Sequence, residues 1–368
     1  MDVLTRMRCR ACSEQSFEPL LRPPEQEVDC GKANLAAMRK LVGFLWLALW
    51  LTGCARPQTP SVVVYCALDQ IYSEPVLRDF ERQSGIRVLA KYDLEATKTS
   101  GLVNLLLLEQ ANPRCDVFWN NEMLQTAVLA RAGALEPYRS PSAQAIPSRW
   151  RDPQNRWTGF AARLRVLIVR RGLSDPPRSI RELGDPRWKG QAGMARPLFG
   201  TTLTHWVALH QALGASEATR LLDQARANEV AILDGNSVVK DRVAAGELAW
   251  GLTDSDDANA AILDGAAVEM VLPDQDDLGT LVIPNTVALI HGAPHPDEGR
   301  KLIDFLLSPA VEEKLARGRS LQIPLHEGAQ GGPHTPDLTR VRAMAVDQAA
   351  MAEQFQTVVG LLRERFQR

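Results

Sequence analysis

The sequence predicts an α/β protein built from two α/β lobes that are joined by two crossing strands. Strand-like apolar runs alternate with helical patterns from Ser61 onward, and this alternation is typical of βαβ units in parallel sheets. Two of the apolar runs, Trp157–Val169 and Gly279–Ile290, are long enough to pass from one lobe into the other. Polar loops follow the strands, and right-handed crossovers place such loops along one edge of a sheet.

The first lobe is expected to start with a buried strand. The run Ser61–Cys66 is rich in β-branched residues, as the strands of parallel sheets are. Helical spacing over Tyr72–Ser84, a second strand over Ile86–Lys91 and a Leu-rich helix over Gly101–Gln110 follow it. A third strand is expected over Cys115–Trp119. This order of elements predicts a parallel sheet that is covered by helices.

The second lobe repeats the alternation of strands and helices. Its expected elements are three strands and the two helices between them, over Gln191–Ala195, Gly200 to about Leu213, Val230–Leu233, Val238–Ala245 and Leu248–Leu252. An amphipathic helical stretch over His295–Leu315, with a break at Pro309, follows the second crossing strand. We assign residues 61–160 and about 280–325 to the first lobe and about 165–278 to the second, and leave the tail, 326–368, without a lobe.

An acidic turn stands at the centre of the predicted site. The apolar run that ends at Leu252 stops abruptly at Thr253-Asp254-Ser255-Asp256-Asp257, and an Ala-rich helical pattern follows. Asp and Ser cap helix N-termini, and acidic residues there suit the helix dipole, so capping alone explains part of the pattern. Three acids within four residues repel one another, and ligands of α/β sheets bind beyond the carboxyl ends of strands. The turn is predicted either to bind a ligand or to cap a helix.

Other polar segments at strand ends supply the remaining candidate residues. Gly200-Thr201-Thr202 opens a helix and offers backbone N–H groups and two hydroxyls to an anion, although simple capping uses the same residue types. Arg163 lies inside the first crossing strand. The loops that follow the other strands add Asp69, Gln70, Thr97, Lys98, Asn120, Asn121, Glu122, Asn236 and Ser237 as ligand-binding candidates.

Charge and motifs narrow the class of function. The net charge is −2, whereas nucleic-acid-binding proteins carry basic faces, so no nucleic-acid partner is expected. His205 and His210 lack the H-E-x-x-H arrangement, and the sequence has neither a G-x-S-x-G elbow nor a P-loop. A binding protein is therefore favoured over an enzyme. Two alternatives stay open: an anchored ligand sensor, and a metal-dependent hydrolase that uses the Asp254, Asp256 and Asp257 cluster.

The N-terminal segment predicts export. The basic Met38-Arg39-Lys40 precedes Leu41–Leu51, an apolar run of the length found in signal peptides and shorter than the roughly 20 residues of a transmembrane helix. Leu51-Thr52-Gly53-Cys54 resembles the bacterial lipobox, whose cysteine is lipidated. We therefore expect that translation starts at Met38 and that residues 1–37 are an upstream extension that does not belong to the protein. Residues 38–53 are then a lipoprotein signal peptide, and residues 54–60 are a tether. The mature protein is expected to be periplasmic or at the cell surface, anchored to a membrane through Cys54.

The cysteines give no paired pattern. Cys9-x-x-Cys12 is half of a zinc-site spacing, but no second ligand pair follows it at a suitable distance. Cys66 and Cys115 each lie in a strand-like run, so a disulfide between them and two buried thiols both stay open.

The order and spacing of several short segments resemble those of a known family. They are Val64-Tyr65, Phe80-Glu81, Gly85-Ile86, Asp116-Val117-Phe118, Pro186-Arg187-Trp188-Lys189-Gly190, Asn236-Ser237-Val238, Gly246-Glu247 and Asp304-Phe305-Leu306. The chain, from about Val62 to His326, resembles the solute-binding proteins of bacterial ABC importers, in particular the ferric-iron type. The resemblance implies the two-lobed fold of type II periplasmic-binding proteins. It also implies a monomer that captures a small solute by hinge closure and delivers it to an inner-membrane ABC permease.

The resemblance places the iron ligands of that family on different residue types here. Its histidine falls on Asp69, its glutamate on Asn121 with Glu122 adjacent, and its tyrosine pair on Asp256 and Asp257. Its anion-holding positions fall on Gly200, Thr201, Asn236 and Arg163, which are retained. Two kinds of solute stay open. One is iron or another metal with an anion, held by hard oxygen donors from Asp69, Asp256 and Asp257. The other is a small organic anion or zwitterion. No cofactor other than such a bound metal is expected.

Overall fold

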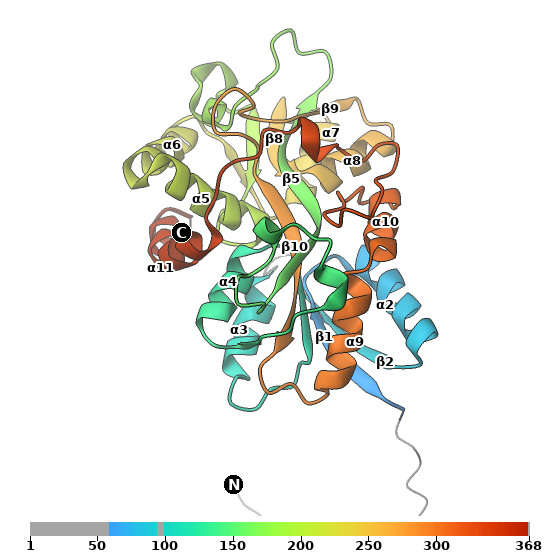
Figure 1. The fold of residues 1–368 in the computed structure, drawn as a ribbon. Helices are drawn as coiled ribbons and strands as arrows, with labels where there is room; N and C mark the ends of the chain where they lie inside the picture. Colours follow the sequence, from blue (N-terminus) through green and yellow to red (C-terminus); the bar gives the residue numbers. More distant parts are fainter. Residues whose placement is uncertain (1–58, 94–98, 367–368) are drawn as a thin grey trace, which may run out of the picture. The chain divides into compact units, whose positions relative to one another are not determined.

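The computed structural model describes residues 59–93 and 99–366 (Figure 1). The expected upstream extension, signal peptide and lipidated Cys54 lie outside these residues, as do Thr97 and Lys98. In the described part of the chain, the strands form one hydrogen-bonded series in the order β2-β1-β3-β10-β5-β8-β6-β7, with β4 beside β10 and β9 beside β5.

The first lobe is built on a short parallel sheet. Its strands are β1 (Ser61–Cys66), β2 (Arg87–Tyr92), β3 (Val117–Asn120) and β4 (Leu135–Glu136). β1 pairs in parallel with both β2 and β3, and β3 pairs antiparallel with β10 (Val282–Ile290). The helices of this lobe are α2 (Gln70–Ser84), α3 (Ser100–Leu108), α4 (Leu124–Arg131), α9 (Pro296–Leu306) and α10 (Pro309–Arg317).

The second lobe has the same layered organisation. Its strands are β6 (Ala192–Ala195), β7 (Ala231–Leu233), β8 (Trp250–Asp254) and β9 (Val268–Val271). β6 pairs in parallel with β7 and β8. Its helices are α5 (Gly200–Leu213), α6 (Ala215–Ala227), α7 (Asn236–Ala244) and α8 (Ser255–Leu263). Because β6, β7 and β8 run in the same direction, the starts of α5, α7 and α8 meet at one edge of the sheet.

Two long strands join the lobes, as the sequence predicts. β5 (Thr158–Arg170) pairs with β10 along its first half and with β8 and β9 along its second half. The pairing with β10 shifts register between Pro284 and Asn285, beside Ala161, whose φ is 44°. The side chains of β5 are buried from Thr158 to Val169, so the crossing strands form part of the core of both lobes.

Most expected elements are present, with ends that differ by at most three residues. The second crossing strand begins at Val282 instead of Gly279, and Thr280, just before it, pairs with Ala343 of the tail. The third strand begins at Val117 instead of Cys115. No disulfide joins Cys66 to Cys115; their thiols donate to the carbonyl oxygens of Leu68 and Val117, respectively.

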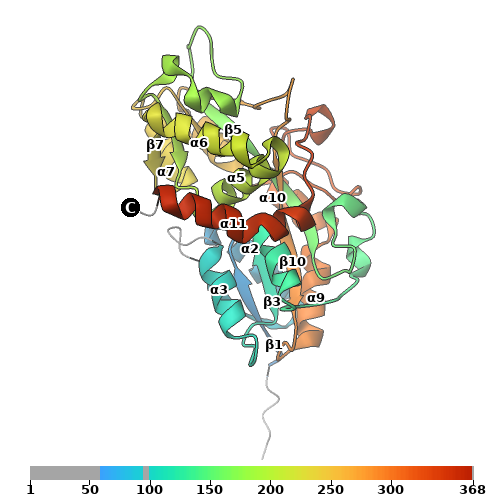
Figure 2. The same cartoon turned by 90° about the vertical axis from the view of Figure 1, so that its left-hand side faces the viewer.

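The tail ends in a long helix that contacts both lobes. α11 (Gln348–Phe366) packs against α4 of the first lobe and α5 of the second, and it crosses in front of both in Figure 2. Its buried side chains include Met351, Val358, Leu362 and Phe366. In the part of the chain that the structure describes, no helix has the length and apolarity needed to cross a membrane.

Candidate functional site

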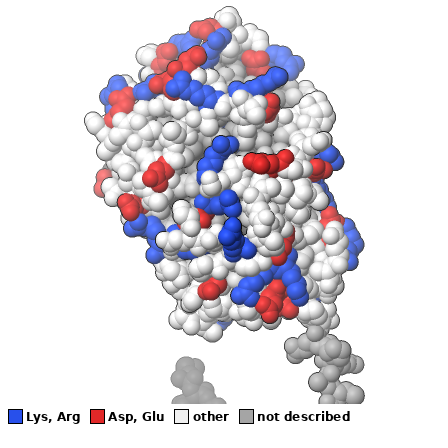
Figure 3. Space-filling view, in the orientation of Figure 1, with Lys and Arg blue, Asp and Glu red and all other residues white. Residues whose placement is uncertain are grey.

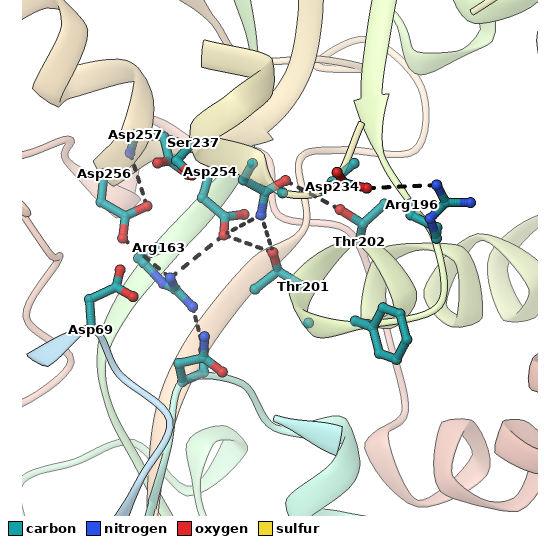
Figure 4. Close-up of a pocket in the computed structure, with 16 residues that line it drawn as sticks. Asp69, Arg163, Arg196, Thr201, Thr202, Asp234, Ser237, Asp254, Asp256 and Asp257 are labelled. Carbon is teal, nitrogen blue, oxygen red and sulfur yellow. Dashed lines mark hydrogen bonds and ion pairs between the residues drawn. The ribbon is translucent and has the colours of Figure 1, made fainter. Parts of the chain in front are cut away.

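A polar cavity of about 200 Å³ lies where the loops of the two lobes meet (Figure 4). Its lining residues are Asp69, Asn121, Arg163, Ala195, Arg196, Phe199, Gly200, Thr201, Thr202, Asp234, Gly235, Asn236, Ser237, Asp254, Asp256 and Asp257. Asp69 and Asn121 follow strands of the first lobe, and Arg163 lies on β5. The others end or follow β6, β7 and β8. The cavity therefore lies at the carboxyl ends of the parallel strands, where α/β sheets bind ligands.

Three helices of the second lobe begin at this cavity. The residues that precede α5, α7 and α8 are Phe199, Gly235 and Asp254. In the described structure, none of these three residues accepts a hydrogen bond with its side chain from the N–H groups of the helix that it precedes. The first N–H groups of a helix have no partner inside the helix and carry a partial positive charge. The starts of α5 and α7 therefore favour the binding of an anionic group, whereas the first turn of α8 carries the carboxylates of Asp256 and Asp257.

Arg165 and Asp254 form a buried framework behind the cavity. Arg165 is 0% exposed, and its Nη1 donates to Asp254 Oδ1 at 2.7 Å and to Asn236 Oδ1 at 3.1 Å. The second oxygen of Asp254 accepts from the Thr201 hydroxyl at 2.7 Å and from Asn236 Nδ2 at 3.2 Å. Burial raises the pKa of Asp254, but the charges of Arg165 and Arg163 outweigh burial and hold it below its ordinary value. The ionised Asp254 thus positions Thr201 and Asn236.

Arg163 lies in the middle of the cavity and connects the two lobes. Its Nη1 lies 3.2 Å from Asp256 Oδ2 and 3.6 Å from Asp254 Oδ2, and its Nη2 donates to the Asn121 carbonyl oxygen of the first lobe. Burial lowers the pKa of Arg163, but the nearby carboxylates of Asp256 and Asp254 raise it overall. Its guanidinium therefore stays charged.

One side of the cavity is acidic, and we name Asp69, Asp256 and Asp257 the acidic end. Figure 4 shows Asp256 and Asp257 on one side of Arg163 with Asp69 facing them. Burial raises the pKa of Asp256, the Arg163 charge opposes this shift, and the charges of Asp254 and Asp69 add to it. Oxygen atoms of Asp254, Asp256 and Asp257 lie within 4.8 Å of one another, which is close enough for a shared cation.

Tyr72 on α2 lies within the electrostatic range of the acidic end. Burial, followed by the charges of Asp256, Asp69 and Asp257, raises its pKa to about 12. Tyr72 is therefore neutral at physiological pH. Its position on a helix face, inside an otherwise ordinary amphipathic pattern, gave no sign of this neighbourhood in the sequence.

The opposite side of the cavity carries hydrogen-bond donors, and we name it the donor end. It consists of Arg196 and the first turn of α5, whereas Figure 4 shows Ser237, from the first turn of α7, beside Asp257. Nη1 of Arg196 donates to the Phe366 carbonyl oxygen at 3.0 Å, and its Nη2 lies 3.7 Å from Asp234 Oδ1. Arg196, Phe199 and Asp234 were not among the residues predicted from the sequence. Arg196 and Phe199 follow β6 and Asp234 follows β7, so the rule that ligands bind at the loops after strands could have identified them.

Several predicted residues lie away from the cavity. Gln70 is on the surface and donates to Glu74 at 2.9 Å. Asn120 and Glu122 are fully buried, and Asn120 Nδ2 donates to Glu122 Oε1 at 3.0 Å. Glu122 also accepts from the Gln125 N–H and from the Thr204 hydroxyl, each at 2.8 Å. These buried residues have structural partners, and the adjacent Asn121 is the one that lines the cavity.

Comparison with known proteins agrees with this architecture. The model of the family described as bacterial extracellular solute-binding protein matches residues 114–350. The major ferric iron-binding protein of Neisseria meningitidis serogroup B is 24% identical over 327 residues, which cover 86% of this chain and 96% of that protein. The family matched here is one of solute-binding proteins and not of enzymes, which confirms the expectation from the sequence.

Two solved structures have the same fold. Iron-bound HitA from Pseudomonas aeruginosa superposes with a TM-score of 0.76 at 21% identity, covering 82% of this chain and 99% of that one. AfuA from Actinobacillus pleuropneumoniae, with fructose-6-phosphate bound, has a TM-score of 0.76 at 21% identity and covers 84% and 99%, respectively. The two-lobed type II architecture predicted from the sequence is therefore confirmed.

Proposed function

Because the chain belongs to the family of bacterial extracellular solute-binding proteins, we propose that it captures a small bipolar organic solute and delivers it to an ABC permease. The solute carries an anionic group, such as a phosphonate, phosphate or carboxylate, and an ammonium or hydroxyl group at its other end. The observation that carries this proposal is the separation of charge along one cavity, with the acidic end on one side of Arg163 and the donor end on the other.

The donor end fits the anionic group of such a solute. The first turn of α5 offers backbone N–H groups that have no partner inside the helix. Arg196 adds a positive charge. Hydrogen bonds between these donors and an anion are stronger than those between neutral groups.

The acidic end fits an ammonium or hydroxyl group. Asp69 comes from the first lobe, and Asp256 and Asp257 come from the second. A donor group between them would be in contact with both lobes. Closure of the lobes about β5 and β10 would therefore be favoured when the solute is bound, because a ligand stabilises the conformation in which it makes more contacts.

The size of the cavity limits the solute. Pockets for drug-sized ligands enclose about 300–1,000 Å³, whereas this cavity encloses about 200 Å³. A solute of a few carbon atoms with two polar ends fits this volume.

A hard metal ion with an accompanying anion is the second candidate solute. It is favoured by the three carboxylates whose oxygens lie within 4.8 Å of one another, and relatives of this chain bear the name of ferric iron-binding proteins. Three contacts of these carboxylates with the protein favour the organic solute. Arg163 already pairs with Asp256, and both oxygens of Asp254 accept hydrogen bonds from protein donors.

Thermal unfolding with chosen probes separates the two solutes. We expect 2-aminoethylphosphonate to raise the Tm more than ethylphosphonate, which lacks the ammonium group. Ligand at 100 times its Kd adds about 2.7 kcal/mol to the stability of the folded state. In Asp257→Asn the difference between the two probes should shrink. A Tm rise with ferric iron and phosphate that a chelator reverses, together with no response to either phosphonate, would reject the organic solute in favour of the metal.

Lipid anchoring through Cys54 completes the proposed function. The apolar segment before Cys54 and the lipobox-like Leu51-Thr52-Gly53-Cys54 support it, as does the short tether before β1. In this proposal the lipidated monomer works outside the cytoplasmic membrane. Metabolic labelling with a radioactive fatty acid tests the anchor: the wild type should be labelled and sediment with membranes, and Cys54→Ala should do neither. Labelling of the variant would contradict the assignment.

A further inference from the structure

The two arginines that line the described cavity differ in how they are held. Arg163 is 3% exposed and contacts two carboxylates and a carbonyl oxygen of the protein. Arg196 is 34% exposed, and Asp234, the carboxylate within reach of it at 3.7 Å, is 86% exposed. An ion pair between exposed groups contributes little, so Asp234 competes weakly with a solute for the guanidinium. Arg196 is thus the arginine with donors to offer a ligand.

The last turn of the C-terminal helix holds Arg196 in place. Nη1 of Arg196 donates to the Phe366 carbonyl oxygen at 3.0 Å. Carbonyl groups in the last turn of a helix have no partner inside the helix and carry a partial negative charge, which suits a guanidinium. The last turn of α11 is held in place by the buried side chains of Leu362 and Phe366 and by an Arg365–Asp223 ion pair at 2.9 Å.

From these contacts we propose that Arg196, positioned by the end of α11, selects the anionic group of the solute. The inference rests on the proposed function and adds that the tail, although it does not line the cavity, determines which anion the cavity prefers. A guanidinium offers a planar fork of donors that binds the oxygens of a phosphonate or phosphate in pairs. A doubly charged phosphonate gains more from this fork than a singly charged carboxylate does.

Isothermal titration calorimetry with a matched pair of probes tests whether Arg196 selects the anionic group. 2-Aminoethylphosphonate and β-alanine share a two-carbon amine and differ in the anionic group. The wild type should prefer the phosphonate. Arg196→Gln should weaken phosphonate binding by about 10- to 100-fold, because hydrogen bonds to a charged group contribute that much to an affinity. The same substitution should weaken β-alanine binding by less than about 3-fold. The phosphonate affinity of Arg196→Lys should lie between those of the wild type and Arg196→Gln. An unchanged ratio of the two affinities in Arg196→Gln would overturn the proposal.

The role of α11 needs its own variants. A chain that ends at Glu364 lacks the Phe366 carbonyl and should lose the phosphonate preference as Arg196→Gln does, while retaining cooperative unfolding. Glu353→Gln is the control, because it breaks the Arg131–Glu353 ion pair at the far end of the same helix and should leave the preference unchanged. A folded shortened chain that keeps the preference would show that α11 does not position Arg196. If that chain fails to unfold cooperatively, Phe366→Ala, which loosens the last turn, replaces it. This variant should also lose the phosphonate preference, and a folded variant that keeps it would show that α11 does not position Arg196.

Inorganic phosphate separates this inference from the proposed function. If the wild type binds neither amine probe, the bipolar solute is wrong, and the role of Arg196 is then measured with phosphate alone. Phosphate bound by the wild type and at least about 10-fold more weakly by Arg196→Gln supports the inference. Equal binding by both proteins, or none by either, overturns it.

Discussion

Glu122 of the first lobe accepts a hydrogen bond from Thr204 of the second lobe, with 2.8 Å between Oε2 and Oγ1 and neither residue exposed to water. The same carboxylate accepts from the Leu124 and Gln125 N–H groups at the start of α4. Thr204 lies in the second turn of α5, whose first turn lines the cavity. This contact therefore links the two lobes directly behind the site.

Replacing Thr204 by Val should destabilise the protein without creating a cavity, because the two side chains have nearly the same shape. The hydroxyl donor to Glu122 is lost, and a hydrogen bond to a carboxylate contributes about 1.5–3 kcal/mol. We expect the free energy of unfolding in urea to fall by that amount. Thr219→Val on α6, at a partly exposed position, is the control and should change it by less than about 0.5 kcal/mol. Equal losses in the two variants would contradict a role for the contact.

The pH dependence of stability should reveal the buried carboxyl of Glu122. Burial raises its pKa above the ordinary value of 4.5, although the donors around it act in the opposite direction. Between the unfolded and the folded pKa, the native state binds more protons than the unfolded state, so stability falls as pH rises through this window. The slope for one proton approaches about 1.4 kcal/mol per pH unit.

Glu122→Gln removes this titration and serves as the comparison. The free energy of unfolding of the wild type minus that of the variant should decrease as the pH is raised above 4.5. Urea unfolding at a series of pH values measures the difference. A difference that stays constant over the whole series would show that Glu122 keeps its ordinary pKa in the folded state.

Cys115 should be unreactive in the folded protein. It is 0% exposed, and burial raises the pKa of its thiol well above the ordinary value, whereas the thiolate is the species that reacts with alkylating reagents. We expect iodoacetamide at pH 8 to leave the peptide that contains Cys115 unmodified until urea is added, as measured by mass spectrometry. Rapid alkylation without urea would show that the segment before β3 opens easily.

The sequence predicted the fold and the edge of the sheet on which the site lies, because both follow from local patterns. The long apolar runs identified β5 and β10, and the polar loops after the strands identified Asp69, Asn121, Gly200 and Asp256. The side toward which each side chain at the end of a strand points was harder to predict. Asn120 ends β3, and Asn121 and Glu122 follow it. All three are buried, and the alternation of side chains is consistent with Asn121 lining the cavity while Asn120 and Glu122 lie away from it.

The contacts that depend on distant segments could not be predicted. Arg165 lies two residues after Arg163 on β5, and its role depends on Asp254 being opposite it in the antiparallel pairing with β8. The end of α11 reaches Arg196 across 170 residues of sequence. No local pattern encodes either pairing, because both arise from the packing of complete lobes.

The buried Arg165 makes Asp254 the carboxylate of the acidic turn on which the fold depends most. Asp254→Asn should lower the free energy of unfolding by about 3–5 kcal/mol, because it leaves a fully buried guanidinium without its charged partner at 2.7 Å. Asp257→Asn is the matched control from the same turn. Asp257 is only partly buried, and its replacement should cost less than about 0.5 kcal/mol. Urea unfolding without added solute measures both. A loss below about 0.5 kcal/mol in both variants would mean that Asp254 is not a structural residue and that the whole turn serves the solute, whereas the expected difference assigns Asp254 to the framework and leaves Asp256 and Asp257 to binding.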